Sequence, residues 1–469
     1  QKRAFTIEDL YKVKNVSSPV LSNSGEKIAF TVSESDLSTG KTNTIVYIMN
    51  TNGSSLVNVS EKIPGASSPF WSSTDELYLM NKGQVYKYSL ETNESVQITD
   101  FYAGVSDPIL SNDGRYLAFT AELFPECGTD NDCNKRLDES SSNGPMQAYI
   151  ADELLFRHWT EKKKKKESYL VLFDIKENKY QAITNSDVLS GTYMLGGGPK
   201  FAFSSDSRVL AYVSSREKNI ANSTNTDIFL MPLGGNQTVN ITLGNDAWDG
   251  APIYSPDGNY IAYKTHSIPG FEADRFRIAV YNTQTLHSEV LTESFDYTTD
   301  NLSWSSDSKS IYFLADSRGY SPVYKVDVET KVVTKITDDK SVRGYQTNKE
   351  EKNLYLTFST VDKPAEIFSY DVNAGVYSQI TYFNKKLTEE VDIRPAEQMW
   401  VDGADGIPVH VFIVKPHGFE EYKKYPLVIN VHGGPQMQWM DSFRGDWQVY
   451  PGSGYVVAFF NPHGSTGYG

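Results

Sequence analysis

The feature that most constrains the fold is a phrase that recurs seven times along the chain. Each copy has a short apolar stretch, a tight turn of the S-x-D-G type, and a second stretch in which apolar and polar residues alternate. Alternation with a period of two on both sides of a small-residue turn is typical of a β-hairpin. The turns begin at Ser22, Ser72, Ser111, Ser204, Ser255, Ser305 and Thr347.

Setting aside one gap of 93 residues, the spacing between consecutive turns is 39 to 51 residues. That period is typical of the four-stranded blades of a propeller. We therefore predict a mainly β chain with a seven-bladed β-propeller over residues 16–385. A sandwich or a solenoid of similar strands is the weaker alternative, because the phrase recurs in order.

The gap of 93 residues predicts an insertion at about 123–167. Its stretch "NGPMQAYIADELLFRHW" places Pro145 where a first helical turn tolerates it and predicts one apolar helix face. The insertion is therefore expected to be partly helical. A further helical segment is expected over residues 1–15, packed near the second domain.

The sequence pattern changes after about residue 385. "EQMWVDGADGIPVHVFIVKP" predicts a hairpin, whereas "YPLVINVHGG" and "SGYVVAFFNPHG" contain continuous apolar strands. Such strands are typical of a sheet buried on both faces in an α/β domain. Residues 386–469 are therefore predicted to be the N-terminal part of such a domain, incomplete in this chain.

Charge and hydropathy exclude several classes of partner. The chain has 44 basic and 59 acidic residues and a net charge of −15, which argues against nucleic acid. It has no apolar run long enough to span a bilayer. We expect no metal and no cofactor; "DNDCN" resembles the start of a calcium loop, but Lys135 stands where the turn glycine is needed.

Cysteines and glycosylation triplets bear on the compartment. Cys127 and Cys133 lie in a polar loop and are predicted to form a local disulfide. Together with eight N-x-S/T triplets, this pair favours a secreted or lumenal protein and leaves a lysosomal or vacuolar location open. The triplets begin at Asn15, Asn52, Asn58, Asn93, Asn222, Asn236, Asn240 and Asn301.

Two motifs in the second domain carry a family resemblance. "VINVHGGPQ", followed by "GYVVAFFNPHGSTGYG", resembles the opening of the peptidase domain in the prolyl oligopeptidase family. The phrases "FTIEDLYKV", "GFEADR" and "FRHW" resemble the secreted dipeptidyl-peptidase V group, in the branch that also holds the acylaminoacyl-peptidases. One departure is His463, where the family usually has Arg before GSTGYG.

The resemblance assigns a role to the two glycines after the apolar strand. In α/β-hydrolases an amide from the loop after the third strand stabilises the oxyanion of the tetrahedral intermediate. By resemblance Gly434 supplies this amide, and His432 shapes the loop. A purely structural role for His432 remains ahead of any direct part in catalysis.

The catalytic triad is not found in this sequence. No G-x-S-x-G occurs in the 469 residues, and none of the seven histidines lies in a matching context. The resemblance places the Ser, Asp and His beyond residue 469. A C-terminal hydrolase segment or a separate chain is therefore expected to complete the fold.

The resemblance implies a secreted serine dipeptidyl peptidase acting on the free N-termini of short peptides, with the propeller as a size filter. A carboxylate would hold the substrate ammonium, and the candidates are Glu272, Asp274 and Glu153; Arg157 could hold a backbone carbonyl. The alternative for all four is ordinary ion pairing. The other functions left open are an acylaminoacyl-peptidase, an oligopeptidase and a non-catalytic binding propeller, and a homodimer is left open as an assembly.

Overall fold

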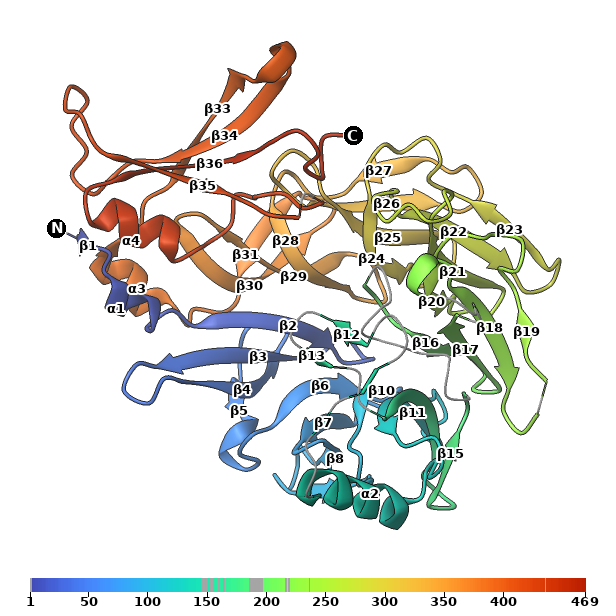
Figure 1. Ribbon diagram of the computed structural model, residues 1–469. Helices are drawn as coiled ribbons and strands as arrows, with labels where there is room; N and C mark the ends of the chain where they lie inside the picture. Colours follow the sequence, from blue (N-terminus) through green and yellow to red (C-terminus); the bar gives the residue numbers. More distant parts are fainter. Residues whose placement is uncertain are drawn as a thin grey trace. The chain divides into compact units, whose positions relative to one another are not determined.

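The computed structural model describes residues 2–144, 148, 150–151, 156–158, 161–162, 165–184, 197–215, 217, 220–235, 237–434 and 436–469. Within these residues, seven four-stranded sheets follow one another along the chain (Figure 1). Six are built from consecutive strands, and the third has an insertion between its second and third strands. The prediction of a mainly β chain is confirmed. Sheet by sheet, the strands are β2 (Asn15–Leu21), β3 (Lys27–Asp36), β4 (Lys41–Asn50), β5 (Val57–Asn58); β6 (Ser67–Trp71), β7 (Leu77–Asn81), β8 (Gln84–Tyr88), β9 (Ser95–Gln97); β10 (Ser106–Leu110), β11 (Tyr116–Leu123), β14 (Glu167–Asp174), β15 (Lys179–Ala182); β16 (Phe201–Phe203), β17 (Val209–Ser214), β18 (Asp227–Pro232), β19 (Val239–Asn240); β20 (Asp249–Tyr254), β21 (Tyr260–Thr265), β22 (Arg277–Asn282), β23 (His287–Val290); β24 (Thr299–Trp304), β25 (Ser310–Ala315), β26 (Val323–Asp327), β27 (Val333–Lys335); β28 (Ser341–Thr347), β29 (Asn353–Thr360), β30 (Lys363–Asp371) and β31 (Val376–Gln379).

The repeated turn residues form a small hydrogen-bonded unit that explains the recurring phrase. The Ser111 hydroxyl donates to Asp113 Oδ1 at 2.6 Å and accepts from the backbone N–H of Tyr116 at 2.9 Å. A buried hydroxyl must have partners, and here the turn supplies them locally. The same Ser-to-Asp bond, also 2.6 Å, recurs at Ser204, Ser255 and Ser305.

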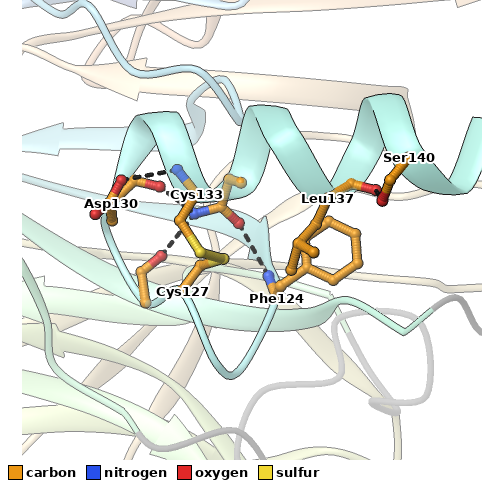
Figure 2. The surroundings of a disulfide bond; sticks show 8 residues. Phe124, Cys127, Asp130, Cys133, Leu137 and Ser140 are labelled. Carbon is orange, nitrogen blue, oxygen red and sulfur yellow. Dashed lines mark hydrogen bonds between the residues drawn. A yellow bond between two sulfur atoms is a disulfide. The ribbon is translucent and has the colours of Figure 1, made fainter.

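The insertion between β11 and β14 begins with a disulfide-bonded helix, α2 (Asn131–Asn143). Cys127 and Cys133 are joined, and Asp130 caps the helix by accepting from the Cys133 amide at 2.8 Å (Figure 2). The sequence predicted a polar loop here, because α2 has no apolar stripe; the cap and the disulfide hold the first turn instead. A short hairpin follows, β12 (Arg157–His158) and β13 (Glu161–Lys162). Most of the helix predicted from Pro145 onward lies outside the described residues.

The C-terminal part of the chain forms an eighth, mixed sheet with the strand order β33-β34-β36-β35. β34 is antiparallel to β33 and β36, whereas β35 is parallel to β36. The crossover between the two parallel strands carries a helix, which is the usual connection for parallel neighbours. The elements are β33 (Ala396–Asp402), β34 (Pro408–Val414), β35 (Leu427–Val431), α4 (Asp446–Gly452) and β36 (Val456–Asn461).

The chain divides into two compact units. Unit 1 comprises Gln1–Trp71, Ser294–Asn301 and Lys309–Gly469, and unit 2 comprises Ser72–Glu293 and Leu302–Ser308. The short elements are β1 (Arg3–Ala4), α1 (Ile7–Leu10), η1 (Val59–Glu61), η2 (Ile220–Asn222), α3 (Lys385–Glu390), β32 (Val391–Asp392) and η3 (Ala404–Gly406).

Within unit 1 the first sheet packs against the seventh. Val16 and Phe30 share a buried apolar cluster with Tyr355 and Ile367, more than 300 residues later in the chain. The mixed sheet has its own core, in which Trp447 of α4 stacks on Phe459 of β36. Burial of such large side chains provides most of the favourable free energy of packing.

The N-terminal segment also belongs to unit 1 and lies beside α4 (Figure 1). Phe5 is buried in a cluster with residues of α3 and β32, and Leu10 contacts Gly445 at the start of α4. The buried Asp9 accepts from Arg3 at 2.6 Å and from Lys12 at 2.9 Å. The Arg3 hydrogen bond, more than any other contact, lowers the pKa of Asp9.

Candidate active site

The loop after β35 contains the glycine that the sequence singled out. Gly434 has a φ of +129°, a conformation that L side chains rarely adopt, and it is exposed to solvent. A Cβ at this position would lie 2.7 Å from the backbone nitrogen of Gln436. Both the backbone conformation and the lack of space therefore require glycine here.

The Gly434 amide is available to a ligand. Within the part of the chain that the structure describes, its N–H donates no hydrogen bond to backbone or side chain. The loop follows the carboxyl end of a parallel strand, where α/β sheets commonly bind ligands. An exposed N–H with no partner, on a backbone held by its neighbours, can donate to an oxyanion.

His432 ties the Gly434 loop to the loop after β36. Its Nε2 lies 2.8 Å from the Ser465 hydroxyl, and its Nδ1 lies 2.9 Å from the carbonyl oxygen of Gly433. Because a carbonyl only accepts, Nδ1 carries a proton and donates. The ring is buried and packs edge-on against Trp439 at 5.8 Å. These contacts hold the two loops together and leave both ring nitrogens engaged.

Two further side chains position the same loops. The Gln438 side chain accepts from the Gly319 amide at 2.9 Å and donates to the Tyr320 carbonyl at 2.8 Å. Asn461, the last residue of β36, accepts from the Trp439 amide at 2.6 Å. The sequence analysis did not single out Ser465, Gln438 or Asn461. The available signal was their position: Asn461 and Ser465 lie inside the second motif, and Gln438 lies two residues after the first.

Asp274, one of the predicted substrate-binding residues, lies in unit 2 and is fully engaged inside it. Its carboxylate accepts from the amides of Ser267 (2.7 Å), Ile268 (3.1 Å) and Arg275 (2.8 Å). It also pairs with Arg277 at 3.2 Å, and these bonds lower its pKa against the opposing effect of burial. The carboxylate therefore stabilises the loop between β21 and β22.

The other predicted substrate-binding residues have different outcomes. Glu272 lies in the same loop, exposed to solvent. Glu153 and the side chain of Arg157 lie outside the described residues. Gly434 and His432 lie together in unit 1. Glu272 and Asp274 lie together in unit 2.

Close to Asp274, unit 2 buries two groups with opposite pKa shifts. Burial raises the pKa of Asp249 to about 7, although Asn245 donates to both of its oxygens at 3.1 Å. Burial lowers the pKa of His266 to about 4, and its ring stacks on Phe276 at 4.1 Å. The charged groups that act on His266 are Asp274, Arg277 and Lys264.

These shifts predict a pH dependence that an Asp249→Asn variant exposes. Between pH 4 and 7 the unfolded chain has lost the Asp249 proton and the folded chain retains it, so this group makes stability fall as pH rises. His266 acts in the opposite sense between its folded pKa of about 4 and its unfolded pKa near 6.5. In Asp249→Asn, of these two groups only His266 still contributes to the pH dependence of the unfolding free energy.

We expect the difference in unfolding free energy between wild type and Asp249→Asn to change by roughly 1.4 kcal/mol per pH unit over this range. Urea unfolding at several pH values measures it. Profiles that run parallel for the two proteins would show that Asp249 ionises normally in the folded state.

The glycosylation triplets differ in accessibility, and Asn236 lies outside the described residues. Asn58 and Asn240 are half-buried. The exposed ones are Asn15, Asn52, Asn93, Asn222 and Asn301.

None of the helices in the described residues has the length and hydrophobicity needed to cross a membrane. The same residues contain no group of three or more His, Cys, Asp or Glu arranged to hold a metal ion.

The comparisons with known proteins agree with the motifs. No family model matches the chain. It is 26% identical over 480 residues to a dipeptidyl-peptidase 5 of Porphyromonas gingivalis, covering 99% of this chain and 69% of that protein. Among solved structures, the Pyrococcus horikoshii acylaminoacyl peptidase has a TM-score of 0.79 at 16% identity, covering 99% of this chain and 68% of that one.

A third similarity concerns the strands before residue 385. The β-propeller domain of the trilobed protease from Pyrococcus furiosus has a TM-score of 0.54 at 14% identity, covering 80% of this chain and 97% of that one. At this identity the likeness shows the fold alone. Taken with the HGGPQ and GSTGYG motifs, the relatives support the predicted family: over almost its whole length the chain is similar to the dipeptidyl-peptidase 5 proteins.

Proposed function

We propose that the whole protein is a secreted serine dipeptidyl peptidase that releases dipeptides from the free N-termini of short peptides. The observation that carries this proposal is the exposed Gly434 amide, which has no partner among the described residues, on a loop fixed by His432. The proposal is supported by the similarity of 99% and 100% of this chain to two proteins named dipeptidyl-peptidase 5. The chain spans 69% and 68% of the length of these two relatives, and the proposal concerns the whole protein.

In this proposal the seven sheets are the blades of a seven-bladed propeller. The packing of the first sheet against the seventh supports this, since a closed ring brings its ends together. The ring would admit short peptides and exclude folded proteins.

The mixed sheet is proposed as the beginning of an α/β-hydrolase domain. Its edge strand β35 exposes Leu427, Ile429 and Val431, each more than half accessible. An uncovered apolar edge favours aggregation, so a further strand and helices are expected to cover it. We infer that a C-terminal hydrolase segment or chain provides them together with the triad, which would lie beyond residue 469.

The proposed chemistry is acyl transfer. The serine Oγ attacks the carbonyl carbon of the second residue, and its proton passes to the histidine. The resulting oxyanion accepts from the Gly434 N–H and from the amide after the serine. Collapse of the intermediate breaks the C–N bond, and the leaving amine takes the proton. Water then hydrolyses the dipeptidyl ester and restores the serine.

Recognition of the substrate amine requires a carboxylate that is free to accept from it. Of the three carboxylates, Asp274 already accepts from Ser267, Ile268 and Arg275 of its own loop and from Arg277 of β22, whereas the exposed Glu272 keeps its carboxylate accessible. We therefore propose Glu272, with Glu153 as the second choice and Arg157 for a substrate carbonyl. Without an amine anchor the protein would be an acylaminoacyl-peptidase or an oligopeptidase, and without a triad it would be a binding propeller.

Secretion is proposed from the disulfide and the five exposed N-x-S/T asparagines. A homodimer is the assembly to test first by light scattering. Release of glycans by an amidase, read as a fall in mass, would support passage through the secretory pathway. A mass equal to that of the bare polypeptide would argue against it.

The proposed function is tested with the full-length protein and two substrates, Ala-Ala-p-nitroanilide and its N-acetylated form. A dipeptidyl peptidase cleaves the first and ignores the second, because the free ammonium is bound. Release of acetyl-alanine from the acetylated form alone, read by mass spectrometry, would identify an acylaminoacyl-peptidase, and release of nitroaniline from that form would identify an oligopeptidase. Cleavage of neither, with no labelling by a fluorophosphonate probe, would leave the binding propeller as the function.

A further inference from the structure

Two arginines of unit 1 stand apart from the others in the described chain. Most arginines lie within 4.0 Å of a carboxylate, namely Arg3, Arg115, Arg208, Arg275, Arg277, Arg394 and Arg444. Among the residues that the structure describes, Arg136, Arg318 and Arg343 have no such partner. Arg136 lies on the exposed helix α2 of unit 2, whereas Arg318 and Arg343 lie beside the Gly434 loops.

Arg343 belongs to β28 and is exposed to solvent. Its guanidinium donates to the hydroxyl of the buried Ser442 at 3.3 Å. Surrounding protein nevertheless lowers the pKa of its guanidinium, and the charge of Arg444 lowers it further, against the effect of Asp316. A guanidinium has five N–H donors, and one neutral hydroxyl satisfies only a small part of this capacity.

Arg318 is held next to the same strand. It lies in the turn Ser317–Tyr320, between β25 and β26, and its side chain is exposed. The residue after this turn, Ser321, pairs with Ser341 at the start of β28, and the Val342 amide donates to the Ser321 carbonyl at 3.2 Å. Backbone bonds thus place the two arginines on adjoining segments.

Both arginines touch the two loops that form the candidate active site. The Arg318 amide donates to the Gly467 carbonyl at 2.9 Å, in the loop after β36. Ser442, the partner of Arg343, lies in the segment after β35 that also holds Gly434. Arg343 through its side chain and Arg318 through its backbone are therefore each bonded to one of these two loops.

We propose that Arg343 and Arg318 form a subsite for a carboxylate of the peptide substrate. The carboxylate is either the C-terminal group of a short peptide or an acidic side chain in the part that leaves. This inference rests on the proposed function and names its substrate class. A planar guanidinium binds a carboxylate through two parallel hydrogen bonds. Such a local cationic site is needed because a protein with a net charge of −15 otherwise repels anionic peptides.

The test compares peptide pairs on the full-length enzyme. Ala-Ala-Ala-Ala is measured as free acid and as C-terminal amide, and Ala-Ala-Asp-Ala-amide is measured against its Asn counterpart. We expect wild type to prefer one of the anionic peptides by about 10-fold or more in kcat/KM, mainly through KM. The pair that shows the preference identifies the source of the carboxylate.

Variants then assign the preference to the subsite. Arg343→Gln should bring the ratio of anionic to neutral kcat/KM close to one, and Arg343→Lys should restore part of it. Arg136→Gln, which removes the same charge from an unpaired arginine in unit 2, should keep the wild-type ratio. If Arg343→Gln does not fold, Arg318→Gln and Ser442→Ala should each lower the ratio in its place.

Equal rates for both members of both pairs in wild type would overturn the subsite and leave the proposed function standing. The subsite would also be overturned if folded Arg343→Gln kept the wild-type ratio of anionic to neutral kcat/KM. Where Arg343→Gln does not fold, an unchanged ratio in both Arg318→Gln and Ser442→Ala would overturn it. Failure to cleave any of the peptides would overturn the proposed function and this inference with it.

Discussion

Replacing Gly434 by alanine in the full-length protein should lower turnover by about one to three orders of magnitude while the protein remains folded. The Cβ would lie 2.7 Å from the Gln436 nitrogen, at a φ of +129° that alanine rarely adopts. The loop must therefore shift, and the Gly434 N–H moves away from the developing oxyanion. Because this amide acts on the transition state, the loss is expected in kcat more than in KM.

The matched control is Gly433→Ala. A Cβ on Gly433 meets no described atom within 4 Å, and its φ lies outside the left-handed region. This variant should lose much less activity than Gly434→Ala, and thermal unfolding should be similar for the two. Unchanged turnover in Gly434→Ala would remove this amide from the oxyanion site.

The second large effect is on stability. A Cβ on Gly452, the last residue of α4, would lie 1.9 Å from the carbonyl oxygen of Phe5 and 2.9 Å from its carbonyl carbon. Backbone atoms cannot yield as a flexible side chain can, so the N-terminal segment must leave α4. Gly452→Ala should therefore lower the free energy of unfolding by about 3 kcal/mol or more.

Urea unfolding of the chain with Gly452→Ala measures this loss, and Gly244→Ala serves as its control. A Cβ on Gly244 meets nothing described within 4 Å, so its effect should be within about 1 kcal/mol. Faster proteolysis near Phe5 in Gly452→Ala would locate the damage in the N-terminal segment. A variant as stable as wild type would show that this segment does not pack on α4 in solution.

The local features of the fold could be predicted because their causes are local. The turn that begins at Ser111 is held by a hydrogen bond to Asp113 and another from Tyr116, all within six residues. The need for glycine at 434 likewise arises from its own backbone and from Gln436. The helix α2 was read as a polar loop within the predicted insertion, because it has a cap and a disulfide but no apolar period.

By itself the sequence determined the repeat of β-hairpins, the change to a mixed sheet after residue 385, and the loop that offers the Gly434 amide. These depend on alternation, turn chemistry and backbone conformation over a few residues. Only the tertiary structure decided which charges are already used. The Asp274 carboxylate is already hydrogen-bonded and ion-paired by its neighbours, whereas the Arg343 guanidinium forms no ion pair with a carboxylate of the described residues. The physical reason is that the state of a charged side chain depends on neighbours far away in sequence, as Ser442 is from Arg343, and only folding brings them together.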